Sequence, residues 1–219
     1  MNRDMLNVYF VMGTENCNGK DPSFVLQEAI RGGITLFQFR EKGDTALQGQ
    51  EKVSLAIKLR DICHQHKVPF IVNDDINLAL EVNADGVHIG QEDDDFISVK
   101  RRLPAKSIIG VSCHTLEEAA KAIADGADYL GVGPMFFTTT KKDIHAVQGP
   151  KVIREIRDKG YTIPIVGIGG INNSNARKVL EHGADGIAVI SAISMATYPS
   201  NAAFELKEIH KTVKNNSPI

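Results

Sequence analysis

The sequence predicts an α/β fold in which eight strand–helix units close into a single (β/α)8 TIM barrel. Short β-rich runs and helix-forming segments alternate eight times along the 219 residues, a pattern typical of a parallel sheet with crossover helices. A four-residue pattern also recurs where three helices end, and no Pro-rich, Ser-rich or low-complexity stretch interrupts the units. Eight repeats favour a closed barrel over an open sheet, so we expect residues 1–219 to form one domain.

The elements follow from local composition. Short β-rich runs predict strands at 7–12, 34–40, 69–73, 86–89, 107–112, 129–132, 163–167 and 186–191. Segments with helical spacing or helix-forming residues predict helices at 23–31, 46–66, 77–82, 96–102, 116–124, 150–159, 173–182 and 201–212. Thr115 is a predicted N-cap, with Glu118 as its capping-box partner.

The recurring pattern is Asn-Ala-Asp-Gly at 83–86, Gly-Ala-Asp-Tyr at 126–129 and Gly-Ala-Asp-Gly at 183–186. Gly or Asn at a helix end can adopt the left-handed conformation, and the apolar residues that follow enter the next strand. The repeat is therefore expected to be structural, at the barrel face opposite the chemistry.

Composition narrows the functional classes. The 25 basic and 27 acidic residues leave a formal charge of −2, which gives no general attraction to nucleic acid or to an anionic membrane. Three cysteines without metal-ligand spacing indicate neither a disulfide framework nor a zinc site. No export signal or membrane span is evident, so we expect a cytoplasmic protein. The sequence does not set the oligomeric state, and a homo-oligomer is compatible with it.

In a barrel of this kind, chemistry belongs where strands end and lead into the following helices. The second strand ends in Gln38, Phe39, Arg40, Glu41 and Lys42. Strand alternation would place the amide, the guanidinium and the ammonium group on one face, and such a face suits phosphate. The alternative for this segment taken alone is a solvated edge strand.

Acidic side chains follow the third and fourth strands. Asp74 and Asp93 are the candidates for a shared Mg²⁺, because neighbouring parallel strands end roughly 5 Å apart and hard cations prefer oxygen ligands. As an alternative, Asp75 caps the next helix and residues 92–95 form a solvated turn. Whether Asp75 or Asp94 joins the metal is left open.

Hydroxyl groups occupy the next two strand ends. Ser112 can offer its hydroxyl to the barrel mouth, whereas the nearby His114 has no identifiable acid partner and is interpreted as an ordinary loop residue. The long loop 133–148 carries Thr138, Thr139, Thr140 and Lys141, a combination suited to a phosphorylated ligand with a leaving group. The alternative is a mobile, soluble loop.

The seventh strand runs into Gly-Ile-Gly-Gly-Ile at 167–171, and the eighth ends at Ile190 and Ser191. Glycine lets main-chain N–H groups approach an anion, and barrels of this type often bind phosphate after strands seven and eight. Gly170 and its neighbours therefore predict a phosphate site, although Gly-Gly alone indicates only a tight turn.

Taken together, these motifs resemble the thiamine-phosphate synthase family over nearly the whole chain. They are 38–42, Asn73-Asp74, Gly-Gln-Glu-Asp at 90–93, Gly-Val-Ser at 110–112, Thr-x-Thr-Lys at 138–141, 167–171 and Val-Ile-Ser-Ala-Ile at 189–193. One departure is Phe137, where the family commonly has Pro.

The resemblance implies condensation of 4-amino-2-methyl-5-(diphosphooxymethyl)pyrimidine with 4-methyl-5-(2-phosphooxyethyl)thiazole, giving thiamine phosphate and diphosphate. It implies a pyrimidine diphosphate site, a thiazole phosphate site and a Mg²⁺ site at Asp74 and Asp93. The pyrimidine diphosphate site would comprise Gln38, Phe39, Arg40, Glu41, Lys42, Asn73, Ser112 and Lys141, with Arg40, Lys141 and Ser112 also assisting the reaction. The thiazole phosphate site would comprise Thr138, Thr139, Thr140, Gly170, Ile190 and Ser191.

Two other functions stay open at this point. A related thiazole tautomerase would transfer a proton on a thiazole phosphate and would need no diphosphate or metal site. A barrel that has lost catalysis would serve as a sensor of a phosphorylated ligand.

Overall fold

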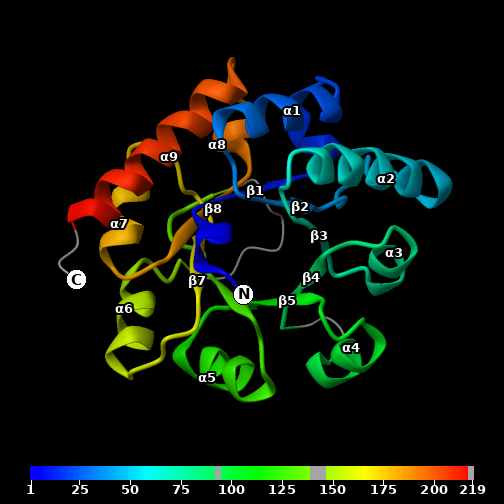
Figure 1. Cartoon of the computed structure of the whole chain (residues 1–219). Helices are drawn as coiled ribbons and strands as arrows, with labels where there is room; N and C mark the ends of the chain where they lie inside the picture. The colour runs from blue at the N-terminus through cyan, green and yellow to red at the C-terminus, as the bar shows by residue number, and fades with distance from the viewer. Residues whose placement is uncertain (92–94, 139–146, 217–219) are drawn as a thin grey trace.

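Eight parallel strands form a closed barrel in the computed structural model, which describes residues 1–91, 95–138 and 147–216. The strands follow one another in chain order around the barrel, and β8 pairs with β1 to close it (Figure 1). Their bounds are β1 Val8–Met12, β2 Leu36–Phe39, β3 Phe70–Asn73, β4 Gly86–Ile89, β5 Ile108–Cys113, β6 Tyr129–Val132, β7 Ile165–Ile168 and β8 Gly186–Val189. The predicted fold class is confirmed.

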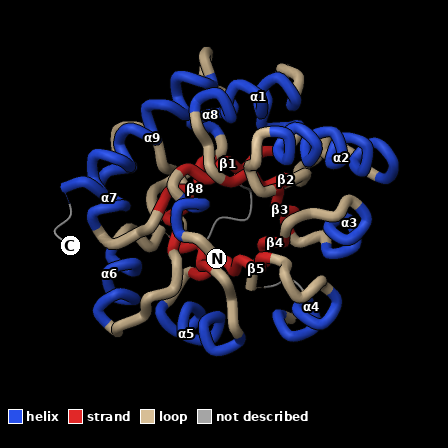
Figure 2. The backbone as a smooth tube through the Cα atoms, in the orientation of Figure 1, coloured by secondary structure: helices blue, strands red, loops and turns tan. Residues whose placement is uncertain are grey.

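Helices surround the strands as an outer ring (Figure 2). They are α1 Pro22–Gly32, α2 Gly49–Gln65, α3 Ile76–Glu81, α4 Phe96–Arg102, α5 Leu116–Asp125, α6 Lys151–Asp158, α7 Ala176–Glu181, α8 Ser191–Ser194 and α9 Pro199–Asn216, with 3-10 turns η1 Arg3–Leu6 and η2 Thr14–Cys17. Across the described parts of the chain, no helix combines the length and apolarity needed to cross a membrane.

The barrel separates two layers of apolar side chains. The larger layer lies between strands and helices and includes Phe10, Phe37 and Phe70. The smaller layer fills the barrel interior and includes Val11, Val166 and, from η1, Leu6. Because Leu6 belongs to the interior layer, η1 closes the amino-terminal end of the barrel. The carboxyl end is the one left for a ligand.

The repeated four-residue pattern builds the closed face, as predicted. Gly126 and Gly183 have φ values of +97° and +102°, and each follows a helix. The Asp of each copy accepts a backbone N–H across the sheet edge, with Asp85, Asp128 and Asp185 each 2.8 Å from the donor nitrogen. The repeat therefore connects helix ends to neighbouring strands by hydrogen bonds, at the barrel end opposite the candidate residues.

Element ends differ from the prediction by a few residues. The second strand stops at Phe39 and the eighth at Val189, so Arg40 and Ser191 lie just beyond the sheet. The Arg40 N–H still donates to the Met12 carbonyl at 2.9 Å, although no further rung of the ladder follows. Helix α8, with only four residues, was not predicted, because one helical turn is too short to show a 3.6-residue period.

Candidate active site at the carboxyl ends of the strands

The described candidates gather at one end of the barrel, because every strand is parallel. Arg40 follows β2, Asn73 ends β3 and Asp74 follows it, Ser112 lies on β5, and Gly170 follows β7. Asp93, Thr139, Thr140 and Lys141 lie outside the described residues, as does Asp94. The mouth of the barrel is thus the common location of those candidates that the structure places.

A hollow of about 310 Å³ lies between the ends of β2 and β3. Two ion pairs cross it, one between Lys42 and Asp74 and one between Lys52 Nζ and the Asp75 carboxylate at 2.7 Å. Because β2 stops at Phe39, the loop and not the strand pleat places Lys42, which corrects the predicted alternation. The hollow is lined by Phe39, Glu41, Lys42, Lys52, Val72, Asn73, Asp74, Asp75 and Leu78.

Asp74 has an unusual backbone. Its φ is +59°, in the left-handed region, which Asp adopts more readily than most non-glycine residues. Its N–H donates to the His88 carbonyl at 2.9 Å, and Asn73 donates its side-chain amide to the carboxylate. These bonds hold the carboxylate between the ends of β3 and β4.

Asp75 has the helix-capping role given above as the alternative to metal binding. One carboxylate oxygen accepts the Leu78 N–H at 2.9 Å, which caps α3, and the other is paired with Lys52. Burial acts to raise the pKa of Asp75, but the bonds from Lys52 and from the α3 backbone outweigh it and lower that pKa. Both oxygens are therefore already engaged within the protein.

Asp74 fits a magnesium site, since carboxylates are hard oxygen donors. Within the described part of the chain, no three His, Cys, Asp or Glu side chains cluster as metal ligands. The second expected ligand, Asp93, lies in the segment 92–94 outside the description. The metal site therefore stays a prediction.

Five polar side chains form a continuous hydrogen-bonded chain across the barrel interior, just below the mouth. Gln38 Nε2 donates to the Tyr9 hydroxyl at 2.8 Å, and that hydroxyl lies 2.8 Å from the Tyr129 hydroxyl. The Tyr129 hydroxyl lies 2.9 Å from His88 Nδ1, and His88 Nε2 lies 2.9 Å from Ser112 Oγ. The two predicted residues, Gln38 and Ser112, are thus the ends of one network.

Neutral tyrosines form the middle of this network, because burial raises the pKa of both Tyr9 and Tyr129. Gln38 Nε2 donates to the Tyr9 hydroxyl, and either tyrosine hydroxyl can donate to the other. A neutral His88 donates from one ring nitrogen and accepts at the other, so its tautomer sets the direction of the bonds to Tyr129 and Ser112.

Two glycines make room for the network. A side chain at Gly110 would overlap the Tyr129 ring, and a Cβ at Gly131 would lie 2.8 Å from His88 Cε1. Sequence reasoning missed Tyr9, His88 and Tyr129. The available signal was a polar side chain at an inward position of a short strand, where an apolar residue is the norm.

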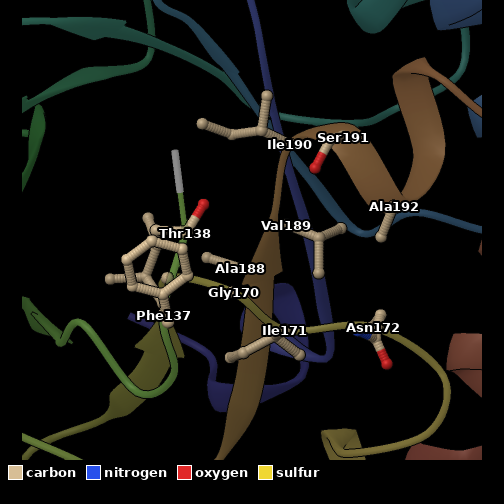
Figure 3. Close-up of a pocket in the computed structure, with 12 residues that line it drawn as sticks. Phe137, Thr138, Gly170, Ile171, Asn172, Ala188, Val189, Ile190, Ser191 and Ala192 are labelled. Atoms are coloured by element: carbon tan, nitrogen blue, oxygen red, sulfur yellow. The ribbon is translucent and has the colours of Figure 1, made fainter. Parts of the chain in front are cut away.

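A second hollow, of about 380 Å³, lies at the ends of β7 and β8. Figure 3 shows Thr138, Gly170, Ile190 and Ser191 around it. Gly170 has a φ of +66°, and a Cβ there would lie 2.6 Å from the Phe137 carbonyl oxygen. Only glycine suits that position, so the backbone of the β7–α7 turn can lie against the loop that follows β6.

The neighbouring predictions have mixed outcomes. Phe137 is 77% exposed at the rim of this hollow. Thr115 caps α5 as predicted, but Glu118 accepts the N–H of His114 and not that of Thr115. His114 Nδ1 lies 2.6 Å from the Gly133 carbonyl, a bond between loops that agrees with its interpretation as a non-catalytic residue.

Fold and site together define a (β/α)8 barrel protein with two hollows flanking β1 at the carboxyl ends of its strands. A family model described as thiamine monophosphate synthase matches residues 8–193. The chain belongs to this family.

Curated relatives agree. The chain is 60% identical over 192 residues to the thiamine-phosphate synthase of a Bacillus cereus strain, covering 88% of this chain and 87% of the relative. It is 57% identical over 204 residues to that of Bacillus cereus strain ATCC 10987, covering 93% and 90%.

Solved structures extend the likeness. Thiamine phosphate pyrophosphorylase from Pyrococcus furiosus superimposes with a TM-score of 0.85 at 37% identity, covering 96% of this chain and 98% of that one. A 3-hexulose-6-phosphate synthase shares the fold, with a TM-score of 0.69 at 16% identity over 93% of this chain and 99% of that one.

Proposed function

We propose that this protein is a thiamine-phosphate synthase, a transferase that joins the pyrimidine diphosphate and the thiazole phosphate into thiamine phosphate and releases diphosphate. The observation that carries the proposal is the pairing of two hollows at one barrel mouth, on either side of β1, one lined by Lys42 and Lys52 and the other by Thr138, Gly170 and Ser191. Family membership and the names of the curated relatives support the same activity.

The pyrimidine diphosphate is assigned to the side of β2 and β3. There Lys42 lines the hollow, and Arg40, which is 8% exposed, lies two residues before it in the same loop. The Gln38–Ser112 network supplies polar groups in the barrel interior. Lys141 is proposed to complete the charge from the loop after β6. Magnesium bound at Asp74 and Asp93 would neutralise negative charge on the diphosphate.

The thiazole phosphate is assigned to the hollow at β7 and β8. Thr138 and Ser191 offer hydroxyls, and Gly170 brings the backbone close to the bound anion. Ile190 gives the hollow an apolar wall for the thiazole ring. Thr139 and Thr140 are proposed to add contacts from the same loop.

The proposed reaction breaks the bond between the pyrimidine methylene carbon and the diphosphate oxygen. Both electrons of that bond leave with diphosphate, and the cation that remains is stabilised by its aminopyrimidine ring. The thiazole nitrogen then donates its lone pair to the methylene carbon. No protein nucleophile or acid–base pair is required, so the residues act by positioning and by charge neutralisation.

The test is release of diphosphate by the purified protein. Mixing both substrates with Mg²⁺ should give diphosphate and thiamine phosphate in equal amounts, and chelation of the metal should stop the reaction. A thiazole tautomerase would instead act on a thiazole phosphate alone and without metal. A sensor would bind its ligand and release no diphosphate.

The cellular location and the partners of the protein belong to the same proposal. All three cysteines are buried as free thiols, which suits the proposed reducing cytoplasm. The partners proposed are the two phosphorylated small molecules.

A further inference from the structure

Two loops at the mouth, residues 13–21 after β1 and 40–48 after β2, are tied together by a pair of glutamate–threonine contacts. Each loop contributes one glutamate and one threonine. Glu41 from the second loop binds Thr14 of the first, and Glu15 from the first binds Thr45 of the second. We call these four residues the loop clasp.

The Glu41 half is buried. The residue is 8% exposed, and its carboxylate has three donors. One oxygen accepts the Thr14 N–H at 2.9 Å, and the other accepts both the Thr14 hydroxyl and the Leu47 N–H, the latter at 2.9 Å. Hydrogen bonds to a charged group are the stronger kind, and they fix the second loop at its start and near its end.

The Glu15 half is more exposed and fixes the middle of the same loop. Its carboxylate accepts the backbone N–H of Thr45 and, at 2.9 Å, the Thr45 hydroxyl. Gly43 lies directly against this carboxylate with a φ of +131°, so a side chain there would overlap it. Gly13 is likewise packed on the Arg40 carbonyl.

The clasp holds the two cations proposed for the diphosphate. Arg40 and Lys42 are the chain neighbours of Glu41, and Lys42 pairs with Asp74 across the hollow while the Glu41 carboxylate binds the first loop. Both oxygens of Glu41 are engaged by protein donors, which leaves it poorly suited to the direct ligand contact expected from the resemblance. An ordered loop also lowers the entropic cost of gathering positive charge around an anion.

We propose that Glu41 is a positioning residue, whose contacts with Thr14 and Leu47 pre-order the loop that presents Arg40 and Lys42 to the pyrimidine diphosphate. This inference rests on the proposed function and refines it. It predicts an effect on one substrate only, because the thiazole phosphate hollow draws no described residue from either loop.

The test is a graded series of variants with KM measured separately for each substrate. Glu41→Ala removes all three contacts, Glu41→Gln can keep the two made by one oxygen, and Thr14→Val removes only the hydroxyl contact. We expect KM for the pyrimidine diphosphate to rise in the order T14V, E41Q, E41A. The rise should reach tenfold or more for E41A, because the loss of one hydrogen bond to a charged group corresponds to roughly a tenfold change. KM for the thiazole phosphate should stay within about twofold, as expected when a substitution alters only the other substrate's binding.

Glu51→Ala is the matched control, because Glu51 is an exposed glutamate in the first turn of α2, just after the same loop. It should leave both KM values unchanged. If E41A does not fold, T14V and E41Q still decide the question.

Three outcomes would overturn the inference. Equal rises in both KM values would indicate general damage. An unchanged pyrimidine KM in E41Q and T14V would show that the clasp is irrelevant to binding. Equal damage by E41Q and E41A with an unaffected T14V would show that the carboxylate contacts the ligand or metal directly. Failure of the proposed function is distinguishable, because the unsubstituted protein would then release no diphosphate.

Discussion

Removing one hydroxyl from the barrel interior, in Tyr129→Phe, tests the buried hydrogen-bonded chain directly. The Tyr129 hydroxyl lies 2.8 Å from that of Tyr9 and 2.9 Å from His88 Nδ1. Its removal takes one hydrogen-bond partner from the Tyr9 hydroxyl and one from His88 Nδ1. Both groups are buried, so neither can turn to bulk water.

The expected cost follows from those two groups. An unsatisfied buried polar group costs about 1–3 kcal/mol, and Phe removes the need to solvate the lost hydroxyl itself, so we expect unfolding free energy to fall by about 2–4 kcal/mol. Tyr9→Phe should lower the unfolding free energy by less than Tyr129→Phe does. One of the two groups that lose a partner is then the Gln38 amide, which lies at the outer end of the hydrogen-bonded network. The double variant should be less destabilised than the sum of the two, by about 1 kcal/mol, because the residues share a bond.

Urea unfolding measures these values. The chain has no Trp, so far-UV circular dichroism and tyrosine fluorescence are the two probes, and a two-state free energy is assigned where they coincide. A loss below about 0.5 kcal/mol for Tyr129→Phe, the size of an ordinary surface substitution, would refute the argument. Additive losses in the double variant would refute the shared bond.

Three further predictions follow from the site and the core. Asp74→Asn should lower turnover by tenfold or more at limiting Mg²⁺, on the scale of one lost charge interaction, and a metal titration that superimposes on that of the unsubstituted protein would contradict this. Gly170→Ala should raise KM for the thiazole phosphate and spare the pyrimidine diphosphate, since its Cβ would press on the Phe137 carbonyl, and an equal rise in both KM values in steady-state kinetics would show that the strain spreads further. Burial raises the pKa of Cys17 and Cys113 to about 12, whereas thiols of the unfolded chain lose their protons near pH 8.5. The free energy of unfolding should therefore fall as the pH rises from about 8.5 toward 12. Urea midpoints that stay constant between neutral and alkaline pH would contradict this prediction.

Much of the architecture could be predicted from the amino-acid sequence. Eight alternations of strand and helix, the helix-ending repeat and the order of polar motifs at strand ends are local features, each visible within a few residues. Parallel strand direction then brings Arg40, Asp74 and Gly170 to one end without any further information. Boundaries were less certain because strand ends depend on a partner's ladder: Arg40 still donates to Met12, yet the pairing stops there.

Period and motif order are properties of the chain alone, so they predicted the barrel, the end of it that carries the polar motifs and the residue types available for holding two anions. How inward side chains from different strands meet depends on the folded barrel, which joins Gln38 to Ser112 through three residues that local patterns did not indicate. It also showed that the Glu41 carboxylate accepts the backbone N–H groups of Thr14 and Leu47. Hydrogen-bond partners distant in sequence are chosen by barrel closure and by the space that Gly110 and Gly131 leave open, and neither is encoded in a single segment.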